Sequence, residues 1–261
     1  MSFRKLLTLL TLIVLIGQPS CARFGASRSQ SAARVAAEEQ AAIDQILQRY
    51  EQALGGRQAI DAIKSYKMEG SFQIQGMSGK IAGWRKEPDK TLTVLEFPRF
   101  GTLKKGFDGQ TRWVQTPAGT VSDENAEEEI AEMERDAEVF SAGRIKSLFE
   151  SMKLDYNARL SGREVRVIEG KPAKGPAERL YFDVENGLLL RWDMARKQNN
   201  RGRVFVKVHL DDYKDVDGLK VPHKVRFAFE SFNFIVQVEK LENNIEIDDA
   251  IFRKPESLLD R

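Results

Sequence analysis

The sequence is poor in the residues that most often build reactive or metal sites, with one cysteine and two histidines among 261 residues. A single cysteine cannot form a disulfide within the chain. His209 and His223 lack the paired spacing of a zinc site, and the sequence has neither a Gly-x-x-x-x-Gly-Lys-Ser/Thr loop nor a Gly-x-Ser-x-Gly elbow. We therefore expect no metal, no cofactor and no enzymatic activity.

An excess of charge of one sign is also missing from most of the chain. The whole sequence has 41 Lys and Arg against 39 Asp and Glu, and residues 1–22 contain only Arg4 and Lys5 among these types. The remainder is therefore balanced, 39 against 39. Nucleic-acid binding usually requires a basic surface, so we expect no nucleic-acid partner.

Only the N-terminus carries a long apolar run. Arg4 and Lys5 precede an apolar and hydroxyl segment from Leu6 to Gly17, which Gln18-Pro19-Ser20 ends. This run is shorter than the roughly 20 residues that a membrane-spanning helix needs. The pattern predicts a signal peptide over residues 1–22 and an exported, periplasmic protein.

Cys21 lies where this apolar run ends, and two interpretations stay open. In the first, Cys21 becomes the lipid-modified first residue of a lipoprotein, and the protein is anchored to a membrane, by analogy the outer membrane. In the second, cleavage follows Ala22 and the cysteine is removed. Small Ser20 suits both cuts, whereas Gln18 and Pro19 depart from the usual lipoprotein signal.

Residues 23–35 are small and polar without periodicity, which predicts a flexible tether. We expect one domain over residues 36–261. It begins with a helix over 36–54 that ends at Gly55-Gly56, and a short helical turn over Gln58–Ile63 follows. A helical insert is predicted over residues 122–151, where an acidic start precedes spaced apolar residues.

Most other segments alternate between apolar and polar residues, as strands do. The predicted strands are Tyr66–Ile74, the segment through Trp84, 91–97, Leu103–Phe107, Thr111–Gln115, Tyr156–Leu160, Glu164–Glu169, Glu178–Val184, Leu188–Met194, Val204–Tyr213, Leu219–Phe229 and Phe232–Leu241. Turns such as Asn186-Gly187 and Asp217-Gly218 predict hairpins. We expect a mainly β (α+β) fold: a curled antiparallel sheet of about eleven strands that forms an incomplete barrel covered by helices.

Several strands place large apolar residues at every second position. A curled sheet lined in this way, under helices 36–54 and 122–151, could leave an apolar cleft for an acyl chain, although each side chain alone is more often core packing. The candidate lipid-binding residues are Leu188, Leu190, Trp192, Met194, Val225, Phe227, Phe229, Phe232 and Phe234.

The order of these landmarks resembles a known superfamily. ILQRYEQALGGRQAIDAIKSYKMEGSF, FDGQTRWVQTPAG, YFDVENGLLLRWD and DDYKDVDGLKVPHKVRF are similar to recurring segments of the bacterial outer-membrane lipoprotein-sorting (LolA-like) proteins. The resemblance covers about residues 43–252 and rests on glycines, aromatics and turns. It implies a half-barrel with a helical lid and an apolar cavity that receives lipid. The long insert and the anchor interpretation of Cys21 mark a divergent member.

These observations favour a cell-envelope carrier or chaperone that binds a lipid or an acylated lipoprotein as a monomer, and that transports it without chemistry. The alternative is a non-catalytic envelope lipoprotein with a solidly packed sheet that acts as a protein-interaction module. A hydrolase built on scattered carboxylates ranks third, because it needs two acids facing each other in a cleft.

Overall fold

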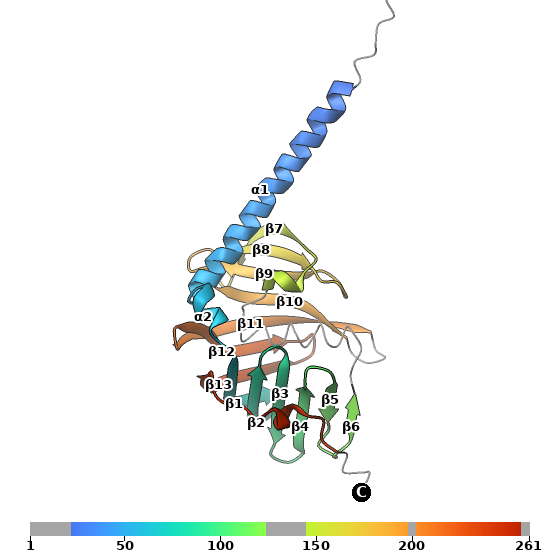
Figure 1. Cartoon of the computed structure of the whole chain (residues 1–261), viewed down its shortest axis with the longest axis vertical. Coiled ribbons are helices and arrows are strands. Elements are labelled where there is room, and N and C mark those ends of the chain that lie inside the picture. Colours follow the sequence, from blue (N-terminus) through green and yellow to red (C-terminus); the bar gives the residue numbers. More distant parts are fainter. Residues whose placement is uncertain (1–21, 124–144, 198–201, 257–261) are drawn as a thin grey trace, which may run out of the picture. The chain divides into compact units, whose positions relative to one another are not determined.

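The computed structural model describes residues 22–123, 145–197 and 202–256 (Figure 1). The chain divides between Glu38 and Glu39 into two compact units. Helix α1 (Ala22–Leu54) crosses this boundary, and the second unit contains all the other described elements. The predicted signal peptide and Cys21 lie outside the described residues.

Helix α1 begins earlier than the sequence analysis predicted. Residues 23–35, expected to be a tether without regular structure, are helical. The segment is rich in alanine, which has the highest helix propensity, and Arg34 Nε donates to Glu38 Oε1 across one turn at 2.8 Å. Local propensity therefore outweighs the missing apolar periodicity on which the prediction depended.

The C-terminal half of α1 packs through one apolar stripe. Ile43, Leu47, Tyr50 and Leu54 recur at helical spacing and are at most 7% exposed. The helix ends at Gly55, whose φ is +130°. A Cβ at Gly55 would lie 2.1 Å from the carbonyl oxygen of Gly218, so only glycine permits this close approach to a strand turn. Helix α2 (Arg57–Asp61) follows and includes most of the predicted helical turn.

The thirteen strands described in the second unit form one sheet. The strands are β1 (Ser65–Ile74), β2 (Met77–Lys86), β3 (Lys90–Phe97), β4 (Gly101–Phe107), β5 (Arg112–Gln115), β6 (Val121–Asp123), β7 (Ser151–Leu160), β8 (Arg163–Lys171), β9 (Glu178–Asp183), β10 (Leu189–Lys197), β11 (Arg203–Val216), β12 (Leu219–Ala228) and β13 (Asn233–Asn243). All the pairings are antiparallel.

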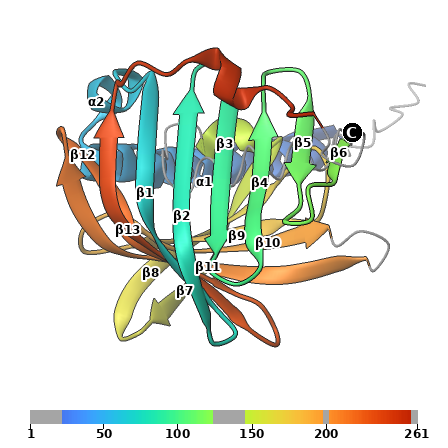
Figure 2. The ribbon, with the colours of Figure 1, turned by 90° about the horizontal axis from the view of Figure 1, so that it is seen from below.

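The strand order is β6-β5-β4-β3-β2-β1-β13-β12-β11-β10-β9-β8-β7. Strand β1 pairs with both β2 and β13, so the first and last strands lie side by side, and β6 and β7 form the two edges. The sheet is strongly curled: β1–β4 run nearly across the direction of β10 and β11 (Figure 2). The predicted mainly β fold is confirmed, with thirteen strands in place of about eleven.

The predicted helical insert over 122–151 lies mainly outside the described residues. At its start, Ser122 and Asp123 belong to the short strand β6, which the sequence analysis did not predict. At its end, a 3-10 helix, η1 (Ile145–Leu148), precedes β7. The described ends of the insert therefore contain less α-helix than expected.

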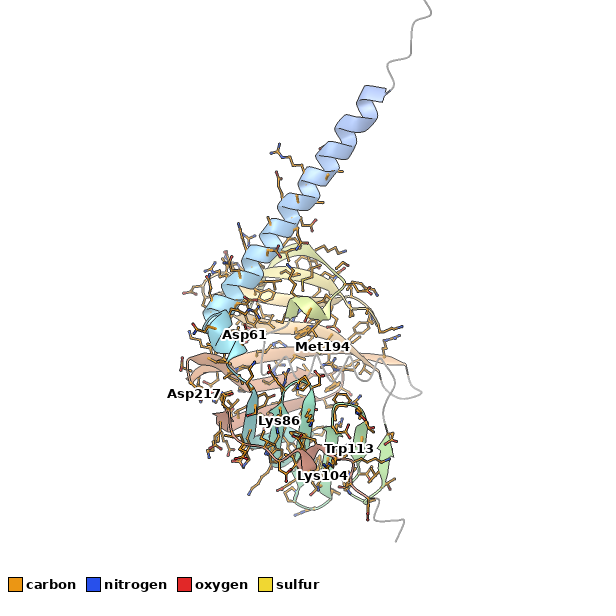
Figure 3. The ribbon with its side chains drawn as sticks, in the orientation of Figure 1. Asp61, Lys86, Lys104, Trp113, Met194 and Asp217 are labelled. Carbon is orange, nitrogen blue, oxygen red and sulfur yellow. The ribbon has the colours of Figure 1, made fainter. Side chains whose placement is uncertain are left out.

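The two faces of the sheet are covered by different parts of the chain. We call the face that packs on α1 and η1 the inner face, and the opposite one the outer face. On the outer face, a C-terminal 3-10 helix, η3 (Asp249–Phe252), packs where Leu92 and Trp113 lie, and Trp113 Nε1 donates to the carbonyl of Phe252 at 2.8 Å (Figure 3). The C-terminal segment is therefore an integral part of the domain.

Candidate functional site

One half of the inner face, formed by β8–β12, is a packed core. Trp192, Met194 and Val225 are at most 1% exposed and share one cluster with Leu188 and the apolar stripe of α1. The Trp192 ring centroid lies 6.1 Å from that of Phe149, and Tyr50 packs edge-on against Phe182 at 5.3 Å. These predicted cavity residues therefore pack against helix in the described part of the protein.

The prediction that Leu190 shares a face with Trp192 and Met194 is wrong. The pairing of β10 with β9 shifts register between Leu189 and Arg191, which is a β-bulge. A bulge inserts one extra residue and reverses the alternation on either side of it. Leu190 therefore packs on the outer face with Val165, Val167 and Tyr181, at 9% exposure.

Beyond this core, and meeting it on β12, the inner face carries four phenylalanines in a row, which we call the aromatic band: Phe97, Phe72, Phe234 and Phe227. Successive ring centroids are 4.9, 5.6 and 5.8 Å apart. The rings come from β3, β1, β13 and β12 and therefore join both ends of the sequence. Phe72 is 1% exposed, whereas the other three are half-buried.

Strand register explains how the aromatic band forms. Phe72 pairs with Val236, Ile74 with Phe234, and Phe227 with Phe234, which places all these side chains on one face. On β2, Gly79 lies between Phe72 and β3, and a Cβ there would come within 2.6 Å of the Phe72 ring. The missing side chain lets the Phe72 ring reach Phe97 across β2.

Two more of the predicted residues lie at the turn between β12 and β13. The rings of Phe229 and Phe232 stack with centroids 4.4 Å apart and planes at 15°. The backbone N–H of Phe229 donates to the carbonyl of Phe232 at 2.9 Å, which closes the turn. The structure thus brings Phe227, Phe229, Phe232 and Phe234 to one end of two paired strands.

The sequence analysis did not select Phe72 or Phe97, although both belong to the aromatic band. Phe72 lies in the predicted strand Tyr66–Ile74, and Phe97 lies in the predicted strand 91–97. Their partners Phe227 and Phe234 lie more than a hundred residues later, and no local pattern pairs them. Only the closure of β1 on β13 supplies that signal.

A separate cavity of about 300 Å³ lies between the turn after β9, residues 210–213 of β11 and the first residues of β8 and β12. It is lined by Arg163, Asn186, Leu188, Leu190, Leu210, Asp211, Asp212, Tyr213 and Lys220. The Tyr213 hydroxyl donates to the carbonyl of Leu189 at 2.8 Å, which braces the bulged part of β10. The cavity is small and mixed in polarity, so it differs in kind from the apolar cleft expected from the sequence.

The outer face carries a cluster of charged residues around Tyr181. The guanidinium of Arg191 lies 3.9 Å from the Tyr181 ring centroid and its Nη2 donates to Asp193 at 2.6 Å. Beside it, burial together with the nearby cations Arg226 and Arg191 lowers the pKa of His209 to about 4. His209 therefore stays neutral at physiological pH.

His223 is buried on β12. It is 7% exposed, and its Nδ1 lies 2.9 Å from the carbonyl oxygen of Val221. Across residues 22–123, 145–197 and 202–256, no three His, Cys, Asp or Glu side chains gather in a way that could hold a metal ion. Within these same ranges no helix combines the length and apolar character needed to cross a membrane.

Comparison with known proteins identifies the fold. No protein-family model and no curated protein matches the sequence. Three similar solved structures each have a TM-score of 0.54: a DUF1329 family protein from Desulfovibrio piger (16% identity, 76% of this chain, 92% of that one), an outer membrane lipoprotein-sorting protein domain from Vibrio parahaemolyticus (12%, 80%, 94%) and a LolA superfamily protein from Nitrosomonas europaea (10%, 81%, 97%). At such identities the likeness concerns the fold. The resemblance seen in the sequence is confirmed at that level: the chain has a LolA-like fold.

Proposed function

We propose that this protein is a non-enzymatic carrier of the cell envelope that holds an acyl chain of a lipid or lipoprotein against the aromatic band. The observation that carries the proposal is the contrast between the two halves of the inner face. Trp192, Met194 and Val225 pack with α1 and η1 and are at most 1% exposed, whereas Phe97 and Phe234 stay half-buried outside that cluster. Phe227 is half-buried where the two clusters meet. Half-buried phenylalanines in a row offer an apolar surface that a flexible chain can cover.

The chemistry of the band suits an acyl chain better than a polar ligand. Its neighbours on the inner face are aliphatic: Met68, Ile81, Val236 and Val238 are all at most 6% exposed in the same cluster. Burial of apolar surface contributes about 25 cal/mol per Å², without requiring directional contacts. Binding would therefore tolerate different chain lengths, as a carrier requires.

The comparison structures support the same assignment. The Vibrio parahaemolyticus domain is described as a lipoprotein-sorting protein, and this chain shares its fold. Together with the predicted signal peptide, this likeness favours a periplasmic location. Lipidation of Cys21 would place the carrier on a membrane, most simply the outer membrane.

The test is native mass spectrometry of the exported protein carrying Cys21→Ser, purified without detergent. We expect adducts with the masses of phospholipids or fatty acids, and saturable uptake of a fluorescent fatty acid. Phe227→Gln and Phe234→Gln should each weaken uptake about tenfold or more, because an amide group replaces apolar contact. Phe205→Gln is the matched control, since Phe205 is 72% exposed.

Phe227→Trp keeps the surface apolar while it fills the space that an acyl chain would use. Loss of uptake in this variant would therefore reflect lost binding and not unfolding. Thermal unfolding by circular dichroism identifies any variant that fails to fold. A clean apo mass together with no uptake of added fatty acid would refute the carrier. That result would favour the protein-interaction module, which the tight packing of Trp192 and Val225 already fits.

A further inference from the structure

Three hairpin turns lie together at one end of the sheet, and two of them expose a large apolar side chain. They are the β1–β2 turn with the first two residues of β2 (75–78), the β3–β4 turn with the first residue of β4 (98–101) and the β12–β13 turn (229–232). We call these twelve residues the hairpin rim (Figure 2). Ile74 pairs with both Met77 and Phe234, and Lys80 pairs with Glu96, so the turns are neighbours through strand register.

The hairpin rim exposes large apolar residues. Phe100 is 63% and Met77 is 38% exposed, whereas the stacked pair Phe229 and Phe232 is half-buried. Exposed apolar groups gathered in one place usually mark a surface that meets a partner or a membrane. Aromatic side chains are favoured at the level of lipid headgroups.

The backbone of the rim is suited to transfer from water into a membrane. Gln75 and Gly76 both have positive φ, +46° and +78°, as a two-residue hairpin turn requires. Phe100 N–H donates to the Phe97 carbonyl at 3.1 Å, and Phe229 N–H donates to the Phe232 carbonyl at 2.9 Å. Turns whose backbone N–H and C=O groups are hydrogen-bonded to each other have a smaller desolvation cost when they enter an apolar phase.

The charge of the rim points to a membrane surface without net charge. Its twelve residues, read from the three ranges, include only Arg99 and Glu230 as charged residues, and these have opposite signs. In the whole chain 31% of residues are charged. An anionic surface would be recognised by clustered Lys and Arg, which the rim does not have.

Resting on the proposed carrier function, we propose that the hairpin rim inserts into the headgroup region of a zwitterionic phospholipid bilayer, where the acyl chain passes onto the aromatic band. The rim is continuous with the band, because Ile74 lies between Met77 and Phe234. An acyl chain would move from membrane to protein along apolar side chains alone. No electrostatic attraction takes part in this docking.

The experiment measures flotation of the Cys21→Ser protein with phosphatidylcholine vesicles at low and high salt. Removing the only cysteine excludes any contribution from a lipid anchor. We expect salt-insensitive partition that Phe100→Ser and Met77→Ser each reduce several-fold, and the double variant by roughly tenfold or more. Ile251→Ser is the matched control, because Ile251 is 36% exposed on η3, away from the rim.

Uptake of a fluorescent fatty acid from solution separates docking from carrying. The rim variants should keep this uptake while losing partition and the transfer of fatty acid from vesicles. Absence of wild-type partition, or partition that needs anionic lipid and disappears in salt, overturns the rim and leaves the carrier standing. Equal loss of solution uptake in the rim variants also overturns docking, because the residues would then belong to the ligand site. If the wild-type protein takes up no fluorescent fatty acid, the carrier function itself is refuted.

Discussion

We expect the C-terminal segment around η3 to stabilise the fold by packing on the outer face, and Phe252→Ala tests this. Phe252 is 0% exposed and packs with Leu92, Trp113 and Ile247. Its backbone carbonyl accepts the Trp113 hydrogen bond, which survives truncation of the side chain. Only the apolar contacts are removed, so the effect reports on packing.

The magnitude follows from the depth of burial. Truncating a fully buried phenylalanine to alanine costs about 3–5 kcal/mol of unfolding free energy. In a domain of this size each kcal/mol shifts Tm by about 2–4 °C, so Tm should fall by roughly 6–20 °C. Ile251→Ala, next to it but 36% exposed, should stay within about 0.5 kcal/mol of the parent protein.

The assay is urea unfolding followed by tryptophan fluorescence and circular dichroism, with calorimetry for Tm. Trp113 reports on this face directly because its indole N–H is bonded there. A loss below about 1 kcal/mol for Phe252→Ala, or equal losses for both variants, would show that the segment does not close the core as inferred.

Two predictions concern pH. The hydrogen bonds from Lys86 and then Lys90 lower the pKa of Asp249 to about 2. The contribution of Asp249 to the free energy of unfolding is therefore present above its unfolded pKa near 4 and is lost as pH falls toward about 2. In urea titrations the stability difference between the parent protein and Asp249→Asn should shrink over that window, and a constant difference would contradict the pairing. The pKa of His209 is lowered to about 4 by burial and nearby Arg226 and Arg191, so the unfolded state binds more protons and stability should fall as pH drops from about 6.5 to 4. His209→Gln should flatten that part of the profile, and an unchanged slope would show that another group titrates there.

Alternation along single strands made the β-rich fold predictable from the sequence. Apolar residues at every second position and turns such as Asn186-Gly187 and Asp217-Gly218 depend only on neighbouring residues. The predicted strands correspond to the observed ones, except for the three-residue β6, which is too short to show a period. The curl also followed, because so many antiparallel strands in one sheet cannot stay flat.

What only the tertiary structure decided depends on contacts between distant residues. The bulge in β10 moves Leu190 to the outer face, and a period of two cannot reveal an inserted residue. The aromatic band needs Phe72 beside Phe234, which follows from pairing the first strand with the last. Local sequence indicates which residues of a strand without a bulge share a face. Register between strands, set by packing over the whole chain, decides which of those faces form a core and which form a site.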